Sequence, residues 1–256
     1  MNRRMFLGIT AGVGLASLAG CGSVLATVPA PEVSKDKLEA GGWKLIDERD
    51  GNLFTERYSG ATVSAAAHTL TFEDRALADT LAERTLDTVD AQMAVFFAGR
   101  VDFSPDLDDL PAAVGRKEVM EQVKQNAKAD FETRLEDAGL TDISEGEATT
   151  FTPDTGETGE LVEYTARFPF EGFTFDVTTE KSVAISGGDI AITGWLAIWH
   201  HGDSTLVAGG AAPAENYAES LTEELSSGVS VTVDIDLGLE PDAYSEEIFS
   251  LMRSVR

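Results

Sequence analysis

The order of hydrophobic and polar residues predicts that most of this chain forms β-strands. In residues 162–170 an apolar side chain occupies almost every second position, and residues 229–237 repeat that alternation. A period of two places the apolar side chains on one face of an extended strand. Residues 190–199 are apolar on both faces, which is typical of a central strand covered on both sides. Less regular patterns predict further strands at residues 43–48, 52–58, 61–72, 91–103, 173–185 and 204–210.

Short turn motifs separate these segments and predict that strands adjacent in sequence are also adjacent in the sheet. Asp50-Gly51 predicts a hairpin turn between the first two strands. Residues 187–189 and residues 200–203 are expected to turn the chain on either side of the central strand. Consecutive hairpins produce antiparallel pairing, so we expect a meander of hairpins. Residues 104–113 are expected to be a loop, and residues 141–159 either a mobile connection or an irregular edge hairpin.

About four segments have the apolar spacing of a helix, with apolar residues three and four positions apart. The longest is followed by Gly139, which stands where a C-terminal cap belongs. Pro213 and Pro241 each stand in the favoured first turn of a further helix. These patterns predict an α+β fold in one globular domain, residues 37–256, with an antiparallel β-sheet flanked by about four helices. The predicted helices cover residues 73–90, 116–138, 213–228 and 241–256.

The chain carries a large excess of acidic residues, and this changes the expected solvent and partners. There are 45 Asp and Glu residues against 19 Lys and Arg residues, for a formal net charge of −26. Such a surface repels itself in ordinary salt, whereas at molar salt the screening length falls to about 3 Å. The composition indicates an extremely halophilic, archaeal source; the alternative is an acidic mesophilic protein that binds cations or basic partners. We expect no nucleic-acid partner, because this surface would repel phosphates.

Residues 1–20 have the three parts of a secretory signal peptide. Arg3 and Arg4 supply the charged start, an apolar run follows at residues 5–18, and small residues lead to Cys21. The apolar run is about 14 residues long, shorter than the roughly 20 residues that a helix needs to cross a bilayer. An uncleaved N-terminal anchor is the alternative. Both interpretations place the domain outside the cytoplasm and on a membrane.

Two short motifs in this segment resemble known export signals. Residues 2–8 resemble the twin-arginine motif, which implies export of an already folded domain. Residues 18–21 resemble a lipobox, which implies that Cys21 becomes the new N-terminus and carries lipid. Cys21 is the only cysteine of the chain, so its lipidation would leave no disulfide and no thiolate metal site. Residues 21–36 then form the lipidated cysteine and a flexible tether.

Two wider resemblances concern the domain itself. Gly42-Trp43 and residues 248–256 look like the bounds of PsbP-like domains, which are antiparallel sheets flanked by helices and serve mostly as accessory or binding modules. Residues 94–98 and 194–203 resemble the signature of an uncharacterised family of haloarchaeal lipoproteins, and that similarity covers the whole chain. The second family brings no known activity, so this resemblance supports a location and a fold rather than a chemistry.

The main candidate for a ligand-binding face lies at the end of the central strand. Trp195 and Trp199 share one face of that strand and could floor an apolar pocket, with core packing as the alternative. His200 and His201 follow, beside Asp203, but adjacent residues of an extended chain point to opposite faces. The two histidines could therefore not both reach one metal ion, and a polar hairpin end is the alternative. We predict no resident metal and no cofactor.

Three other groups of polar residues are weaker candidates. His68 lies in a strand of small residues and is expected to be a core or edge histidine. An acidic loop could ligate Ca²⁺ through oxygen donors, although it lacks the spacing of a known calcium loop. Asp234 and Asp236 lie on one strand face and could mimic a carboxylate pair, or simply face solvent. The residues of the acidic loop are Asp102, Asp106, Asp108 and Asp109.

No catalytic constellation stands out in the domain. It has no Gly-x-Ser-x-Gly turn and no phosphate-binding glycine loop. We therefore expect a cell-surface lipoprotein whose domain is not an enzyme and binds a protein partner or a small ligand. The alternative is an extracellular metal-dependent hydrolase that uses His200, His201 and nearby carboxylates. A solute-binding lipoprotein of an importer fits less well, since those chains are usually longer and two-lobed.

Overall fold

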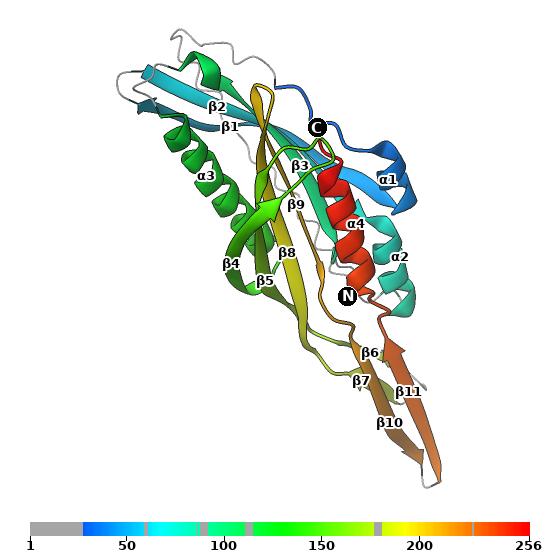
Figure 1. Cartoon of the computed structure of the whole chain (residues 1–256). Helices are drawn as coiled ribbons and strands as arrows, with labels where there is room; N and C mark the ends of the chain where they lie inside the picture. Colours follow the sequence, from blue (N-terminus) through cyan, green and yellow to red (C-terminus); the bar gives the residue numbers. More distant parts are fainter. Residues whose placement is uncertain are drawn as a thin grey trace, which may run out of the picture.

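A computed structural model describes residues 28–58, 61–85, 87, 92–110, 115–176, 181–226 and 228–256. Its centre is an antiparallel sheet of seven strands in the order β1-β2-β3-β9-β8-β5-β4 (Figure 1). Four helices flank this sheet in the described part of the chain, so the predicted α+β class is confirmed. The strands of the sheet are β1 Trp43–Tyr58, β2 Ala61–Asp74, β3 Val95–Ser104, β4 Thr141–Phe151, β5 Gly159–Phe170, β8 Gly188–His201 and β9 Ser204–Pro213.

The two faces of the sheet are covered to different extents. The helices α1 (Lys35–Ala40), α2 (Arg75–Arg84) and α4 (Pro241–Arg253) lie over one face, and α3 (Arg116–Asp137) lies over the other (Figure 1). A separate hydrophobic cluster fills each side. Because both faces are buried, the central strand β8 is apolar on both sides, as its sequence predicts.

The predicted meander exists as two runs of hairpins that meet in the middle of the sheet. The first run is β1-β2-β3, and the second joins β4, β5, β8 and β9. Between them the chain passes through the short 3₁₀ helix η1 (Leu107–Asp109) and α3 to reach the opposite edge of the sheet. Antiparallel pairing of β3 with β9 then joins the two runs into one sheet. The segment expected as a mobile connection or an edge hairpin is the edge strand β4, whose pairing with β5 has two register shifts.

The predicted turn at Asp50-Gly51 is wrong. Asp50 pairs with His68 and Gly51 with Ala67, so β1 continues straight through both residues. The reason is the partner strand: β2 runs for 14 residues without interruption and offers backbone partners along its whole length. The register irregularities on either side of Asp50-Gly51 absorb the mismatch, and β1 stays paired with β2 as far as Tyr58 and Ala61.

Two further predictions fail at the end of the molecule away from the C-terminus (Figure 1). The helix expected from Pro213 is the strand β10 (Ala218–Ser226), which pairs with β11 (Val229–Asp236) in a projecting arm (Figure 1). The regular alternation of β11 provides a partner that outweighs the helical spacing of β10. The strand expected over residues 173–185 folds back on itself as the hairpin of β6 (Phe173–Asp176) and β7 (Ser182–Ile185).

The flexible tether expected over residues 21–36 is wrong for its described part. Val28 and Pro31 are buried, and the backbones of Glu32 and Arg256 exchange two hydrogen bonds of 2.8 and 3.0 Å. Ser34 then caps α1, a helix that the sequence pattern did not predict. We call residues 28–34 the strap, because they tie the start of the described chain to its C-terminal helix. Arg3, Arg4 and Cys21 lie outside the described residues.

Candidate functional site

The predicted tryptophan face is part of the hydrophobic core. Trp195 and Trp199 do share one face of β8, but they are only 7% and 1% exposed. The ring of Trp195 lies 5.3 Å from that of Phe249 on α4, and the ring of Trp199 lies 5.3 Å from that of Phe151. Neither tryptophan lines the two grooves described below. Packing, rather than an open pocket, explains their position.

The two histidines at the end of β8 do not converge. His201 Nδ1 lies 2.6 Å from the Glu157 carboxylate, in the loop between β4 and β5. The pKa of the Glu157 carboxyl is lowered, mainly by the hydrogen bond from the Thr155 hydroxyl and to a smaller extent by His201. His200 Nδ1 is buried without a hydrogen-bond partner. Across the residues that the structure describes, no group of three or more His, Cys, Asp or Glu side chains is placed to hold a metal ion.

The weaker candidates lie in separate local networks of ion pairs and hydrogen bonds. His68 is buried between the carboxylates of Glu48 and Asp50, at 3.0 and 2.8 Å from its two ring nitrogens. Of the predicted acidic loop, Asp102 lies on β3 and pairs with Arg100, and Asp108 lies in η1 and pairs with Arg116. On the arm, Asp234 accepts a hydrogen bond from Ser220, and Asp236 accepts one from the side chain of Asn216. These contacts hold local structure, and they do not bring the three groups of candidates together into one site.

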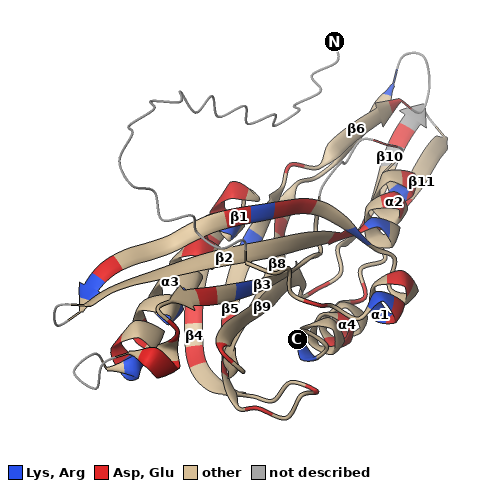
Figure 2. Ribbon diagram, turned by 90° about the horizontal axis from the view of Figure 1, so that it is seen from above, with Lys and Arg blue, Asp and Glu red and all other residues tan. Residues whose placement is uncertain are grey.

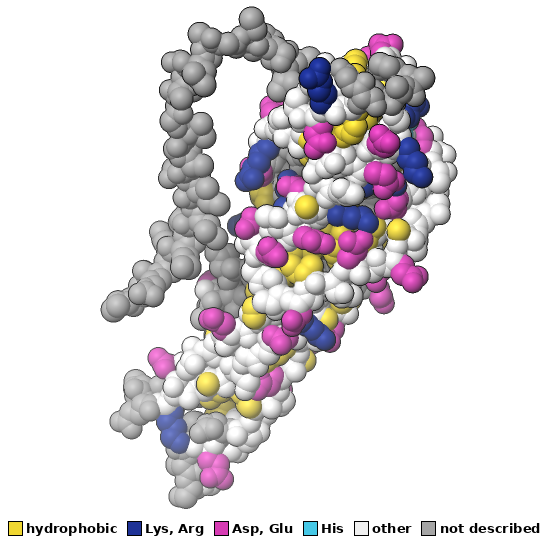
Figure 3. Space-filling model, turned by 90° about the vertical axis from the view of Figure 1, so that its left-hand side faces the viewer, with side chains coloured by type: hydrophobic (Ala, Val, Ile, Leu, Met, Phe, Trp, Pro, Cys, Tyr) yellow, Lys and Arg dark blue, Asp and Glu magenta, His cyan; other side chains and the backbone are white. Residues whose placement is uncertain are grey.

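An apolar groove lies between the last turns of α3 and the sheet, and we call it the α3 groove. Its volume is about 440 Å³. The rings of Phe97 and Phe131, 5.7 Å apart, form part of its lining together with Met93 and Ile192. On the side of the molecule seen in Figure 3, hydrophobic side chains show between charged ones. An apolar interior with a few polar groups at its edge is the usual composition of a small-ligand site.

Two arginines stand at the edge of the α3 groove. Arg134 lies with its guanidinium carbon 5.4 Å from the centre of the Phe97 ring, and its Nε donates to Asp130 at 2.7 Å. Arg49 reaches Asp47 through its Nε at 2.6 Å. In the described part of the chain the terminal nitrogens of both guanidinium groups make no hydrogen bond. They are therefore available to an anionic group on a ligand.

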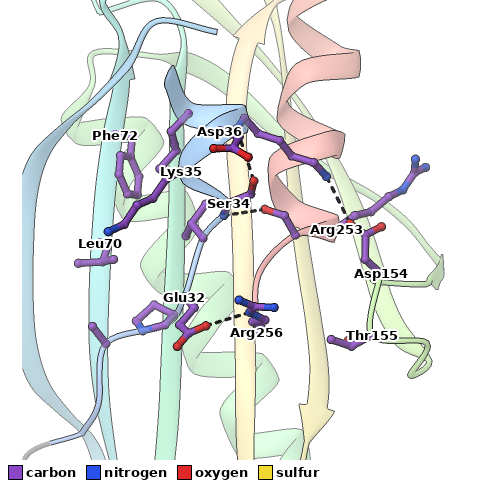
Figure 4. Close-up of a pocket in the computed structure, with 16 residues that line it drawn as sticks. Glu32, Ser34, Lys35, Asp36, Leu70, Phe72, Asp154, Thr155, Arg253 and Arg256 are labelled. Carbon is purple, nitrogen blue, oxygen red and sulfur yellow. Dashed lines mark hydrogen bonds and ion pairs between the residues drawn. The ribbon is translucent and has the colours of Figure 1, made fainter. Parts of the chain in front are cut away.

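A second, larger groove of about 910 Å³ lies between the strap, α1, β2 and the end of α4, and we call it the strap groove. Figure 4 shows Glu32 and Arg256 joined across it by an ion pair of 2.9 Å. Lys37 holds Asp154 at 3.3 Å and also donates to the Ser250 carbonyl. Polar and charged side chains make up most of its lining, and several are already paired to each other.

Buried acids near the start of α2 were not singled out from the sequence. Asp74 caps α2 by accepting from the Leu77 amide at 2.9 Å, and burial raises the pKa of its carboxyl. Glu73 is held by Arg75 and Gln92 at 2.9 and 2.8 Å. Burial also raises the pKa of Glu247, which accepts from the Trp43 indole. The signal for Asp74 was present, because an acid before a helical stripe is an N-cap pattern.

No sequence signal indicated either groove, because their linings come from elements far apart in the chain. The helices that the structure describes include none with the length and apolar character needed to cross a membrane. A family model described as a domain of unknown function (DUF6517) matches residues 30–256. The comparison with curated proteins found no match, and the comparison with solved structures found none.

Proposed function

The chain belongs to the DUF6517 family, and we propose that it is a lipid-anchored, non-enzymatic binding module on the outer face of the cell membrane. The lipobox-like and twin-arginine-like motifs support the anchor at Cys21 and export through Arg3 and Arg4. The acidic composition supports a halophilic archaeal source. The resemblance to haloarchaeal lipoproteins supports this location, and the resemblance to PsbP-like accessory domains supports a binding role.

The α3 groove is the observation that carries the binding role. It combines an apolar lining with two arginines whose terminal nitrogens are free in the described structure. That combination suits a small amphiphile, with its apolar body against Phe97 and Phe131 and its anionic end at Arg49 and Arg134. Binding of this kind needs no catalytic group.

A groove-filling variant tests this proposal. Ala211 lines the α3 groove, so Ala211→Phe should occupy it, whereas Ala148→Phe places the same ring on the exposed edge strand β4. The probe is 1-anilinonaphthalene-8-sulfonate, an anionic amphiphile, measured by fluorescence in multimolar KCl. We expect Ala211→Phe to weaken probe binding by at least about tenfold, which corresponds to about 1.4 kcal/mol, and Ala148→Phe to leave it unchanged. Equal binding by both variants would refute the assignment of the groove.

Mass spectrometry of the native protein tests the anchor separately. We expect a chain that begins at a lipid-modified Cys21, and an intact Met1 with a free thiol would contradict this. Metal analysis at high salt addresses the alternative, an extracellular metal-dependent hydrolase. A stoichiometric transition metal that is lost in His201→Ala would favour that enzyme over the binding module.

A further inference from the structure

We infer that the strap groove faces the membrane and that its basic side chains contact anionic lipid headgroups. This inference rests on the proposed lipid anchor at Cys21. It assigns an orientation to the domain and a partner, the headgroup layer, to a surface distinct from the α3 groove.

The first support is the point at which the chain enters the domain. Val28 is buried, and the chain runs directly from it into the strap groove, whose lining begins at Ala30. Cys21 is seven residues before Val28, and seven residues span at most about 25 Å even when fully extended. A lipid on Cys21 therefore holds this part of the surface close to the bilayer. The β10–β11 arm lies at the opposite end of the molecule (Figure 1).

The second support is the charge of the groove. Four basic residues line it beside three acidic ones, Glu32, Asp36 and Asp154, whereas acids outnumber bases 45 to 19 in the chain. Red acidic positions are spread over most elements in Figure 2. An anionic membrane attracts basic side chains close to its surface and repels acidic ones. The strap groove can therefore approach such a membrane with less repulsion than a surface of average composition.

Two of the basic side chains are free to bind a headgroup. Lys37 and Arg256 are paired with acids, but Lys35 and Arg253 are exposed and have no carboxylate partner among the described residues. Figure 4 shows Lys35 extended beside Leu70 and Phe72, with Arg253 on the other side of the strap. An ammonium and a guanidinium are both donors that bind phosphate oxygens. Lipid phosphates would meet these two groups first.

Amine labelling of the native lipidated protein tests the orientation. The protein is placed in phosphatidylglycerol vesicles, in phosphatidylcholine vesicles and in detergent, at the same salt, and is treated with a membrane-impermeant sulfosuccinimidyl ester. Peptide mass spectrometry compares Lys35 with Lys181, which directly precedes β7 and donates to the Glu224 carbonyl of the arm. In phosphatidylglycerol we expect Lys35 to be labelled at least about fivefold more slowly than in detergent, and Lys181 to be unaffected.

Matched variants test the role of charge. Arg253→Ser should reduce the protection of Lys35, whereas Arg167→Ser, at another exposed arginine on β5, should not. Equal protection in phosphatidylcholine, or none in either vesicle, would overturn the inference while the anchor stands. A protein that does not associate with vesicles and carries a free Cys21 thiol would instead refute the proposed function on which the inference rests.

Discussion

The two grooves lie on opposite faces of the same sheet and differ in both size and chemistry. The strap groove has about twice the volume of the α3 groove, yet most of the residues that line it are polar or charged, and several are already joined by ion pairs. The difference follows from how each face is covered. Among the described residues, three α-helices and the strap pack over one face, while the other is covered by a single α-helix, α3, whose 22 residues extend for about 33 Å, and by the short η1. The smaller groove is therefore the more apolar of the two.

The largest expected effects come from the aromatic residues that line each groove. Phe131 on α3 is 3% exposed and Phe72 on β2 is 6% exposed, so each belongs to the core as well as to a groove. Phe131→Ala and Phe72→Ala should each lower the free energy of unfolding by about 3–5 kcal/mol. Urea unfolding in multimolar KCl measures both. If Phe131→Ala alone lowers the free energy of unfolding by less than about 1 kcal/mol, α3 is not packed tightly against the sheet. The two grooves would then not both be lined by core residues.

A smaller loss of stability is expected when the space between Gly209 and the Phe97 ring, on the α3 face of the sheet, is filled. A Cβ on Gly209 would lie 2.5 Å from the Trp195 carbonyl oxygen and 2.7 Å from the Phe97 ring. Gly209→Ala should therefore destabilise the protein by about 1–3 kcal/mol. Gly51→Ala is the matched control, because a Cβ there meets no atom within 4 Å. If both variants unfold at the same urea concentration, the glycine is not what admits the Phe97 ring.

On the face covered by three helices, we expect loss of the N-cap of α2 to lower the free energy of unfolding by about 1 kcal/mol. Asp74→Ala removes the acceptor for the Leu77 amide and should cost about that much, whereas Asp74→Asn keeps an acceptor. Burial raises the pKa of Asp74 above its usual 3.8, so ionisation opposes folding. The wild type should therefore lose stability relative to Asp74→Asn as the pH rises through 3.8 to the higher folded-state pKa. Unfolding measured from about pH 4 to about pH 7 tests this, and a stability of the wild type that rises with pH relative to Asp74→Asn would contradict it.

The elements that could be predicted from sequence are those whose own apolar pattern and end residues determine their conformation. The α3 stripe predicted its helix to within one residue, and Gly139 has the positive φ of 82° that a C-terminal cap requires. Both faces of β8 are apolar because both are covered. In contrast, β1 and β10 were misassigned at Asp50-Gly51 and after Pro213, because their strand partners determine their conformation and a local pattern does not contain those partners.

The grooves could not be predicted for the same reason. Arg49 and Arg134 line the α3 groove from β1 and α3, and Lys35 and Arg253 line the strap groove from positions far apart in the chain. Spacing along the chain carries no signal for such pairs. The spacing of Trp195 and Trp199 predicts that they share a face of β8, but the covering of that face by α4 is a property of the packed structure.

The smallest expected effect is at the Glu157–His201 pair, in the loop that also supplies Asp154 to the strap groove. The pair is partly exposed, so Glu157→Gln should cost at most about 1 kcal/mol at neutral pH. Its pH dependence should have the opposite sign to that of Asp74. Since the pKa of Glu157 is lowered, its contribution is present above the usual 4.5 and is lost as the pH falls through the folded-state pKa. His201→Ala should remove only part of this, because the Thr155 hydroxyl is the largest cause of the shift. Urea unfolding of both variants and the double variant measures the coupling, and a loss above about 3 kcal/mol would show that this loop holds more than a surface pair.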